Sequence, residues 1–277
     1  MDKHIAFIGG GNMASAIIGG LVAQGFALSH LHVVSHLHVV EPFDAARTKL
    51  HGDFGIQAHA EAGDFLKRAD LVVWAVKPQT FKDAALQVQS FTRNALHLSV
   101  AAGIRSDTIA QWLHTQRVIR SMPNTPALIG KGITALVARD GVSLADKDWA
   151  SAVIQTTGDV LWLSDEAQID AVTALSGSGP AYMFYFMEAM REAGIGMGLD
   201  AAQAYQLAVA TFIGAGELAK ASSEPPEVLR QRVTSKGGTT YAALSAMEHS
   251  GIKASFIQAM QAAQVRAKEL GDEFGAA

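Results

Sequence analysis

The stretch "HIAFIGGGNMA", residues 4–14, contains the glycine pattern that decides the fold. A β-rich run, "HIAFI", leads into it, and the helical stretch "MASAIIGGLVAQG" follows. Gly9, Gly11 and Ala14 form a G-x-G-x-x-A pattern between the two. The first glycine permits a tight turn, the second lets a pyrophosphate approach the backbone, and the small third residue lets helix and strand pack closely. The pattern predicts a strand–turn–helix unit that binds a dinucleotide. The alternative is a glycine-rich turn without a ligand.

The alternation of strand and helix continues through the first part of the chain. "LHVVE" is typical of a strand and "DAARTKLHGDFG" of a helix stopped by glycine, and five more β-rich runs follow: "LVVWAV", "HLSVAAG", "VIRSMP", "GITALVA" and "DVLWLS". Strands apolar on both faces belong to a sheet covered by helices on both sides. After about Asp165 the sequence changes to alanine, methionine and long helical periods. We therefore predict an α/β protein: an N-terminal Rossmann-type, parallel-rich sheet domain over residues 1–165, then an all-α dimerisation domain over residues 166–277.

One predicted helix of the second part is apolar nearly all round. It is "PAYMFYFMEAMREAGIGMGL", residues 180–199. A helix tolerates such a sequence only when it is buried on every side, which one small domain hardly achieves alone. We predict an intertwined homodimer or a higher assembly of dimers. A central helix within a monomeric bundle is the alternative.

Composition narrows the class of partner. The 277 residues include no cysteine, which excludes disulfides, thiolate metal sites and a cysteine nucleophile. The net charge is −4 and the 22 basic residues form no stripe, so we expect a small-molecule substrate and no nucleic acid. No signal peptide and no run of about 18 apolar residues is recognisable, so we expect no membrane association and a cytoplasmic location.

Glu41 is the candidate for the acidic residue that holds the adenosine ribose in dinucleotide sites of this type. That residue is expected at the end of the second strand, roughly 20 residues after the glycine loop. Glu41 follows "HVV" and lies 41 − 14 = 27 positions after Ala14. A carboxylate there repels the 2′-phosphate of NADP, which favours NADH over NADPH. A solvent-exposed strand end without a ligand is the alternative.

The late position of Glu41 coincides with a perfect repeat, "SHLHVVSHLHVV", residues 29–40. Removing one copy of six residues restores a spacing of 21 (27 − 6). Its four histidines resemble a metal site, but along one strand the outer pair would lie about 26 Å apart at ~3.3 Å per residue. We therefore predict no metal site, and instead a tandem duplication in which only one copy pairs as the second strand. Hydrophobic pattern cannot choose the copy, whereas the spacing to Glu41 favours the second.

Further motifs make the prediction specific: "AVKP" at 75–78, "SVAAG" at 99–103, "MPNTPA" at 122–127, "LSGSGPAY" at 175–182 and "TSKGGTT" at 234–240. In this order, together with "FIGGGNMA", they resemble the pyrroline-5-carboxylate reductase family over nearly the whole chain. The resemblance implies hydride transfer from NADH or NADPH to the imine carbon of 1-pyrroline-5-carboxylate, giving L-proline, the last step of proline biosynthesis. An iminium carbon is already electrophilic, so positioning and exclusion of water are the main requirements.

The resemblance also implies roles for individual residues. The pyrophosphate would be held by Gly9, Gly10, Gly11, Asn12 and Met13, and the dinucleotide lined by Val76, Lys77, Pro78, Ala101 and Gly103. Asn124 would either reach the nicotinamide amide or only stiffen its turn. The substrate loop would comprise Ser235, Gly238, Thr239 and Thr240. Thr240 would bond the ring nitrogen as the catalytic residue, contributing about 10²-fold as a general acid, although "TSKGGTTYAAL" also fits an ordinary helix cap.

Two rival functions use the same fold. A β-hydroxyacid dehydrogenase needs a general base, usually a lysine in a helical motif, and "GSGPAYMFYFMEAM" contains none. A non-catalytic nucleotide-sensing subunit would need the glycine loop but not a substrate loop such as "SKGGTT".

Overall fold

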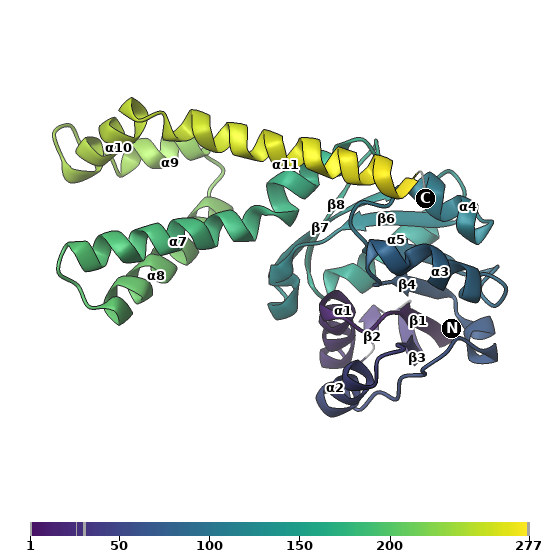
Figure 1. Cartoon of the computed structure of the whole chain (residues 1–277). Coiled ribbons are helices and arrows are strands. Elements are labelled where there is room, and N and C mark those ends of the chain that lie inside the picture. Colours follow the sequence, from purple (N-terminus) through teal and green to yellow (C-terminus); the bar gives the residue numbers. More distant parts are fainter. Residues whose placement is uncertain (1, 26, 30–31, 276–277) are drawn as a thin grey trace. The chain divides into compact units, whose positions relative to one another are not determined.

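The computed structural model describes residues 2–25, 27–29 and 32–275, and its first part is built on one eight-stranded sheet. The strand order is β2-β3-β1-β4-β5-β6-β7-β8 (Figure 1). The strands are β1 (Asp2–Ile8), β2 (Ala27–Ser29), β3 (His32–Val40), β4 (Leu71–Trp74), β5 (Leu96–Ser99), β6 (Val118–Met122), β7 (Gly132–Ala138) and β8 (Gly158–Trp162). Among the described strands, β2 with β3 and β6 with β7 pair antiparallel, and the other neighbouring pairs are parallel. The predicted parallel-rich α/β fold is confirmed.

Helices cover both faces of this sheet. Strand β1 shows why: Ile5 and Phe7 enter one apolar core, and Ala6 and Ile8 enter the other. The first core is completed by α1 (Asn12–Ala23), α2 (Asp44–Phe54) and α5 (Leu144–Gln155), and the second by α3 (Pro78–Val88) and α4 (Ser106–Leu113). As predicted, α2 is followed by a left-handed glycine, Gly55, at φ 70°. Shorter helical turns are η1 (Asp64–Arg68), η2 (Thr125–Ile129), α6 (Gln168–Val172) and η3 (Thr173–Gly177).

The duplicated segment pairs mainly through its second copy. His36 to Val40 lie opposite His4 to Ile8 of β1, so Glu41 follows directly after the end of β3, as the spacing predicted. The prediction that only one copy pairs is wrong in part, because Val33 and Val34 of the first copy also pair with β1. A register shift between Lys3 and His4 skips Ser35, and such a bulge accommodates one extra residue in a paired strand. His30 lies outside the described residues.

Histidine rings lie close together on β1, on the second half of β3 and at the neighbouring His59. The ring centroids of His4 and His36 lie 4.5 Å apart, and His38 lies 6.4 Å from His59. Burial, followed by the charges of the neighbouring histidines, lowers the pKa of His38. Among the residues that the structure describes, no three His, Asp or Glu side chains are placed to hold a metal ion. The repeat therefore contributes a stacked aromatic surface to β1 and β3.

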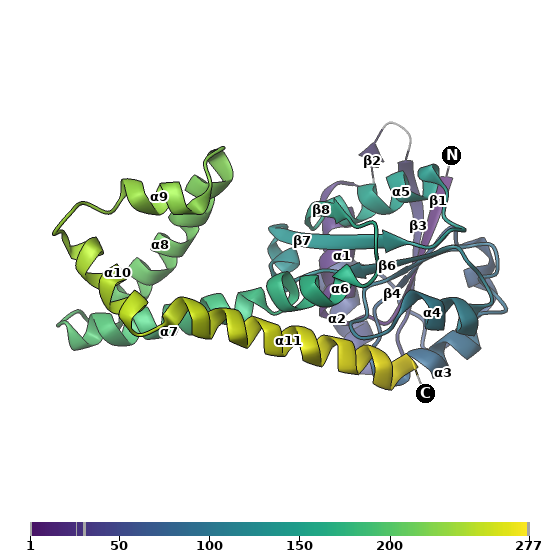
Figure 2. The same cartoon turned by 90° about the horizontal axis from the view of Figure 1, so that it is seen from above.

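The rest of the chain forms a helical unit of its own. Its helices are α7 (Gly179–Gly196), α8 (Ala201–Ala221), α9 (Pro226–Arg232), α10 (Thr239–His249) and the first part of α11 (Ile252–Gly275). Pro180 stands in the first turn of α7, where its missing N–H costs nothing. Asp200 begins α8 with a reciprocal capping box to Gln203. Helices α7 and α8 are joined by the short connection 197–200 and contact each other (Figure 2).

The chain packs into two compact units whose limits differ from the single boundary after residue 165 that the sequence suggested. One unit comprises Met1–Gly177 with Ala263–Ala277, and the other comprises Ser178–Ala262. The segment after β8 stays with the sheet because Ile169 of α6 is fully buried against Ala135 and Val137 of β7. The end of α11 joins the same unit because Phe274 packs on the core beneath α4. Apolar contacts between segments far apart in sequence thus set the division.

His97 of β5 is buried within the protein, although a histidine in a strand is not by itself a sign of burial. It is 1% exposed; its Nδ1 accepts from Trp74 Nε1 (3.1 Å), and its Nε2 lies 3.2 Å from the carbonyl oxygen of Thr92. Burial lowers the pKa of His97 from 6.5 to about 4. The folded protein therefore holds this imidazole neutral, with the proton on Nε2.

We predict that His97 lowers the free energy of unfolding as the pH falls. Between pH 6.5 and about 4, His97 is protonated in the unfolded chain but stays neutral in the folded protein. The free energy of unfolding should fall by about 3 kcal/mol over that range on this account, and His38 adds in the same direction. Denaturant unfolding of the wild type and of His97→Gln at several pH values measures it.

The variant separates packing from protonation. Its stability at pH 7.5, where both states are neutral at position 97, reports the loss of packing and of the hydrogen bonds to Trp74 and Thr92. Between pH 6.5 and 4 its stability should fall less steeply than that of the wild type. An equal slope in the two proteins would contradict the assignment.

Candidate functional site

Four strand ends meet at one edge of the sheet. The Gly9 N–H donates to the carbonyl of Val40 (2.8 Å), the Ala75 N–H to Ile8 (2.8 Å), and the Val100 N–H to Trp74 (3.0 Å). The loops after β1, β3, β4 and β5 therefore begin side by side. From β1 the chain goes first to β3 on one side and later to β4 on the other. The carboxyl ends of parallel strands at such a switch point are where open α/β sheets bind ligands.

The glycine loop has the geometry that its sequence predicted. Gly9 adopts φ +95°, and a Cβ there would fall 2.5 Å from the carbonyl oxygen of Ala75. Gly11, by contrast, has no atom within 4 Å of an added Cβ. Ala14 is fully buried in the core under β1. Asn12 and Met13 open α1, whose first N–H groups have no partner within the helix. The loop thus offers open space and free donors to an anion such as a pyrophosphate.

Glu41 is buried against this loop, with 6% of its surface exposed. Its Oε2 accepts from the Gly10 N–H (2.7 Å) and its Oε1 from the Phe43 N–H (2.9 Å). A carboxylate offers about four acceptor positions, so acceptor capacity remains for ribose hydroxyls. The Nη1 of Arg47 donates to the carbonyls of Glu41 (2.9 Å) and Pro42 (2.7 Å). The alternative of a solvent-exposed strand end does not describe Glu41.

The "AVKP" residues form the connection from β4 to α3. Val76 and Pro78 are half-buried, and Pro78 starts α3, whereas Lys77 is exposed. The carbonyl of Lys77 accepts from the Thr80 hydroxyl (3.1 Å), which fixes the first turn of α3. Cβ of a residue at position 9 would meet Val76 Cγ1 at 3.0 Å, so this connection lies directly against the glycine loop.

Ala101 and Gly103 belong to the loop between β5 and α4. The Ala101 N–H donates to Ser99 Oγ (3.3 Å), and the Ser121 hydroxyl donates to the carbonyl of Ser99 (2.7 Å). Gly103 adopts φ +77°. A Cβ added at this position would lie 3.1 Å from the ring of Phe274, so the ring packs directly on the glycine. The loop is therefore fixed at its start by polar contacts and in its middle by α11.

Asn124 is used by the fold. Its Oδ1 accepts from the backbone N–H of Ile133 at the start of β7 (3.0 Å). It precedes η2, and the chain then turns back into the antiparallel strand β7 instead of entering a long helix. This contact favours the turn-stiffening interpretation of Asn124 over a contact to the nicotinamide.

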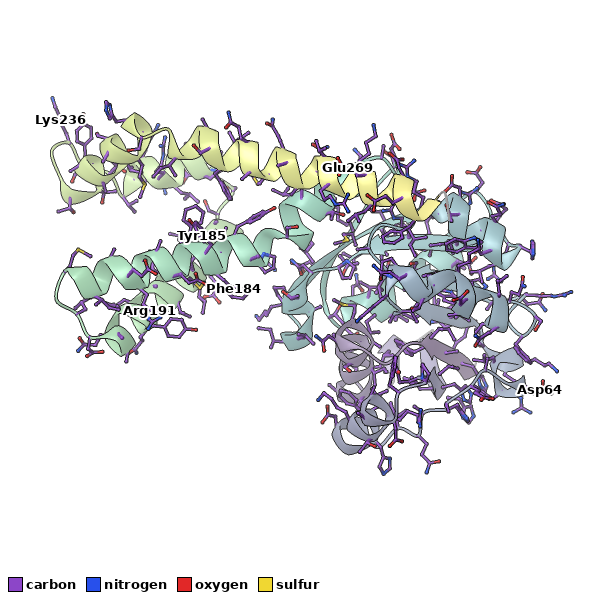
Figure 3. The ribbon with its side chains drawn as sticks, viewed as in Figure 1. Asp64, Phe184, Tyr185, Arg191, Lys236 and Glu269 are labelled. Atoms are coloured by element: carbon purple, nitrogen blue, oxygen red, sulfur yellow. The ribbon has the colours of Figure 1, made fainter. Side chains whose placement is uncertain are left out.

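The predicted substrate residues lie together in the helical unit. Gly237 adopts φ +75°, and the Gly238 N–H donates to the carbonyl of Ser235 (3.0 Å). Helix α10 then begins at Thr239, so Thr239 and Thr240 occupy its first turn, and no side-chain hydrogen bond caps it. Lys236 lies at the tip of this connection (Figure 3). The "SKGGTT" loop therefore presents uncapped helix N–H groups and two hydroxyls, which suits a carboxylate.

Sequence reasoning missed a polar network beside the loop that contains Ala101 and Gly103. Glu166, after β8, accepts from the Ser106 N–H (2.7 Å), from the Ser106 hydroxyl and from Arg120 Nη1 (2.8 Å). A cavity of about 550 Å³ adjoins it, lined by charged residues that include Arg105, Arg139, Asp170 and Lys268. The sequence signal for this network was an arginine, Arg120, within the β-rich run that forms β6.

Comparison with known proteins identifies the family. Pyrroline-5-carboxylate reductase of Pseudomonas aeruginosa is 42% identical over 274 residues, covering 98% of each chain. The chain belongs to the pyrroline-5-carboxylate reductase family. The profile for pyrroline-5-carboxylate reductase dimerisation matches residues 166–270, and that for "NADP oxidoreductase coenzyme F420-dependent" matches residues 4–103. These matches confirm the resemblance drawn from the motifs, and they show a nicotinamide dinucleotide enzyme with an oligomerisation domain.

Solved structures agree with this membership. The pyrroline-5-carboxylate reductase of Coxiella burnetii has a TM-score of 0.88 at 36% identity, covering 98% of this chain and 99% of its own. A Plasmodium falciparum pyrroline carboxylate reductase, solved with NADP bound, shares the fold with a TM-score of 0.83 at 24% identity, covering 97% and 98%. Within the described part of this reductase-family chain, no helix is long and apolar enough to cross a bilayer.

We predict different effects for alanine at two glycines of the loop. Gly11→Ala should leave the melting temperature unchanged, because its Cβ meets open space in the protein. It should weaken NADH binding at least about tenfold, because the methyl occupies the approach of the pyrophosphate. Fluorescence titration with NADH and thermal unfolding measure the two quantities.

Gly9→Ala is the matched comparison. Its strained φ and the clash with the Ala75 carbonyl should lower stability itself. If Gly11→Ala binds NADH as tightly as the wild type, the glycine loop is a structural turn and not the pyrophosphate site.

Proposed function

We propose that this protein reduces the imine of 1-pyrroline-5-carboxylate to L-proline with a reduced nicotinamide dinucleotide. The observation that carries the proposal is the position of Gly9–Gly11 at the edge where β1, β4 and β5 end, in a chain of this family. The dinucleotide would be held by the glycine loop, Asn12, Met13, Glu41, Val76, Lys77, Pro78, Ala101 and Gly103. When bound, the reduced nicotinamide supplies the hydride.

The chain itself has to orient the substrate and control one proton. Reduction of a C=N bond needs a hydride at carbon and a proton at nitrogen, and the iminium form is already electrophilic. Ser235, Gly238 and Thr239 are proposed to hold the substrate carboxylate through the N-terminal donors of α10. The Thr240 hydroxyl, in the first turn of that helix, is proposed to bond the ring nitrogen and orient or relay its proton.

NADH is the proposed preferred donor. Glu41 is buried beside Gly10 and follows the end of β3, so its carboxylate would repel the 2′-phosphate of NADPH at the proposed ribose site. The neighbouring Arg47 donates to the carbonyls of Glu41 and Pro42 and pairs with Asp44 (3.1 Å), so both of its Nη atoms already have partners within the protein. Both features support discrimination against NADPH.

A homodimer, or a higher assembly of dimers, is the proposed quaternary structure. Phe184 and Tyr185 project outward from α7, 59% and 69% exposed (Figure 3). An apolar groove of about 460 Å³, lined by Tyr182, Phe186 and Phe256 among others, lies in the same unit. Large apolar surfaces of this kind mark protein–protein interfaces. A monomer mass in light scattering at micromolar concentration would contradict the dimer.

Two expectations from the sequence stay proposals. We propose that residues 166–277 act functionally as the substrate and dimerisation domain, although compact packing divides the chain after Gly177 and before Ala263. The cytoplasmic location also stays a prediction.

The proposed activity predicts oxidation of NADH only in the presence of the cyclic imine. Absorbance at the nicotinamide band should fall on addition of pyrroline-5-carboxylate, with L-proline as product. The enzyme should not oxidise β-hydroxy acids in the presence of NAD⁺. Binding of NADH without turnover of any imine would sink the proposal and favour a nucleotide-sensing subunit.

Thr240→Val tests the proposed catalytic residue in the same assay. The variant keeps the shape of the side chain and removes the hydroxyl, so kcat should fall by about 10²-fold if the hydroxyl acts as a general acid. Thr239→Val, at the adjacent position of the same turn, is the control and should affect KM for the imine more than kcat. Equal kcat values for Thr240→Val and the wild type would remove Thr240 from its role.

A further inference from the structure

The loop from Val100 to Arg105 connects two rigid elements and contains two of the proposed cofactor residues. At its start, β5 is held by the Val100 N–H on the carbonyl of Trp74 and by the Ser121 hydroxyl on Ser99. At its end, α4 begins at Ser106, which is 3% exposed. The positions of Ala101 and Gly103 therefore depend on where α4 begins.

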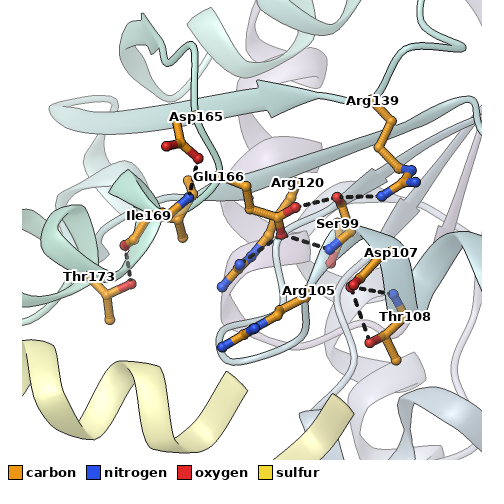
Figure 4. Close-up of polar contacts among 12 residues, drawn as sticks. Ser99, Arg105, Asp107, Thr108, Arg120, Arg139, Asp165, Glu166, Ile169 and Thr173 are labelled. Atoms are coloured by element: carbon orange, nitrogen blue, oxygen red, sulfur yellow. Dashed lines mark hydrogen bonds and ion pairs between the residues drawn. The ribbon is translucent and has the colours of Figure 1, made fainter. Parts of the chain in front are cut away.

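Glu166 fixes the beginning of α4 from a distant part of the chain. Its carboxylate accepts from the backbone N–H and the hydroxyl of Ser106, sixty residues earlier. Arg120 of β6 donates to the same carboxylate at 2.8 Å (Figure 4). Arg139 Nη1 donates to the Ser106 hydroxyl at 3.3 Å. The helix has no capping side chain of its own, because its N-cap residue is Arg105. Glu166 supplies the negative charge that a helix N-terminus favours.

The ion pair between Arg120 and Glu166 is largely shielded from solvent. The Arg120 side chain is 4% exposed and that of Glu166 27%. The Nε of Arg120 has no hydrogen-bond partner in the described part of the chain. A buried pair of this kind often adds little net stability, and its best-attested use is to fix one geometry among several. In this protein the geometry that it fixes is the junction of β6, α4 and the segment after β8.

The far end of α11 makes a second tie to the same loop. Arg105 Nη2 donates to Asp272 Oδ1 at 2.6 Å, and Phe274 packs against Gly103. The Arg105–Asp272 pair is exposed, so it contributes little energy alone. The loop is thus held by the segment that leads into the helical unit and by the helix that returns from it.

We propose that Glu166 is a positioning residue for cofactor binding: through Ser106 and Arg120 it sets the conformation of residues 100–105, which include the proposed dinucleotide contacts Ala101 and Gly103. The inference rests on the proposed function only for the identity of the ligand. Loss of the carboxylate lets the start of α4 shift, and Gly103, three residues earlier, shifts with it. Cofactor affinity falls as a result, while the substrate loop in the helical unit keeps its own contacts.

The test uses Glu166→Gln in the full-length protein, with NADH as the probe. The amide can keep the oxygen that accepts from the Ser106 N–H and from Arg120. It loses the acceptor of the Ser106 hydroxyl and the negative charge, which weakens the contacts to both residues. We expect the dissociation constant and KM for NADH to rise about fivefold, with kcat at saturating NADH and KM for pyrroline-5-carboxylate within about twofold of the wild type. Asp165→Asn is the control, since it removes the same charge at the adjacent exposed position, and it should leave all four quantities unchanged.

Ser106→Ala is the second variant, and it keeps the Arg120–Glu166 pair intact. It removes one hydroxyl and should raise the NADH dissociation constant in the same direction by a smaller factor, even if Glu166→Gln does not fold. The double variant with both substitutions should bind NADH no more weakly than Glu166→Gln alone, since both substitutions act through the same contact between Ser106 and Glu166.

The proposal is overturned if both single variants bind NADH as tightly as the wild type, or if KM for the imine rises as much as KM for NADH. The NADH titration needs no substrate. An absence of turnover in the wild-type protein would therefore count against the proposed function and leave this test in place.

Discussion

The hydrogen bond from the Gly10 N–H to Glu41 Oε2 joins the glycine loop to the end of β3, and the arrangement of the whole cofactor edge depends on it. It exists only because β3 pairs with β1 in one register, with Val40 opposite Ile8. A shift by one residue would turn Val39 and Val40 away from their separate cores and carry Glu41 out of the loop. The burial of two apolar faces therefore sets the position of one carboxylate, which is the proposed partner of the adenosine ribose.

The same logic connects the sheet with the rest of the molecule. The central strands β1 and β4 are apolar on both faces, which requires helices on both sides of the sheet. The loops that lead from β1, β4 and β5 into these helices begin side by side at Gly9, Ala75 and Val100. The last of these loops is not held by the sheet alone, because Glu166 and Phe274 reach it from segments flanking the helical unit. The sheet therefore sets where the loops of the cofactor edge begin, and contacts from distant segments set the conformation of the last loop.

Local signals predicted much of this. The glycine at the end of α2, the proline at the start of α7 and the positive φ of Gly9 all follow from residue chemistry within a few positions. The spacing of Glu41 correctly favoured the second copy of the repeat, but a bulge at Ser35 let the first copy pair as well, which pattern alone cannot reveal. The antiparallel direction of β7, the return of α11 to the sheet and the Glu166 network were missed, because each depends on residues separated by long stretches of chain.

The central claim is that strand register, fixed by the second copy of "SHLHVV", places Glu41 so that it selects the cofactor. The ratio of kcat/KM with NADH to kcat/KM with NADPH, measured with pyrroline-5-carboxylate as the imine, tests it most directly. A buried carboxylate bonded to Gly10 predicts a ratio above one, since the 2′-phosphate of NADPH meets a negative charge. A strong preference for NADPH would contradict the account and remove Glu41 from its assigned role.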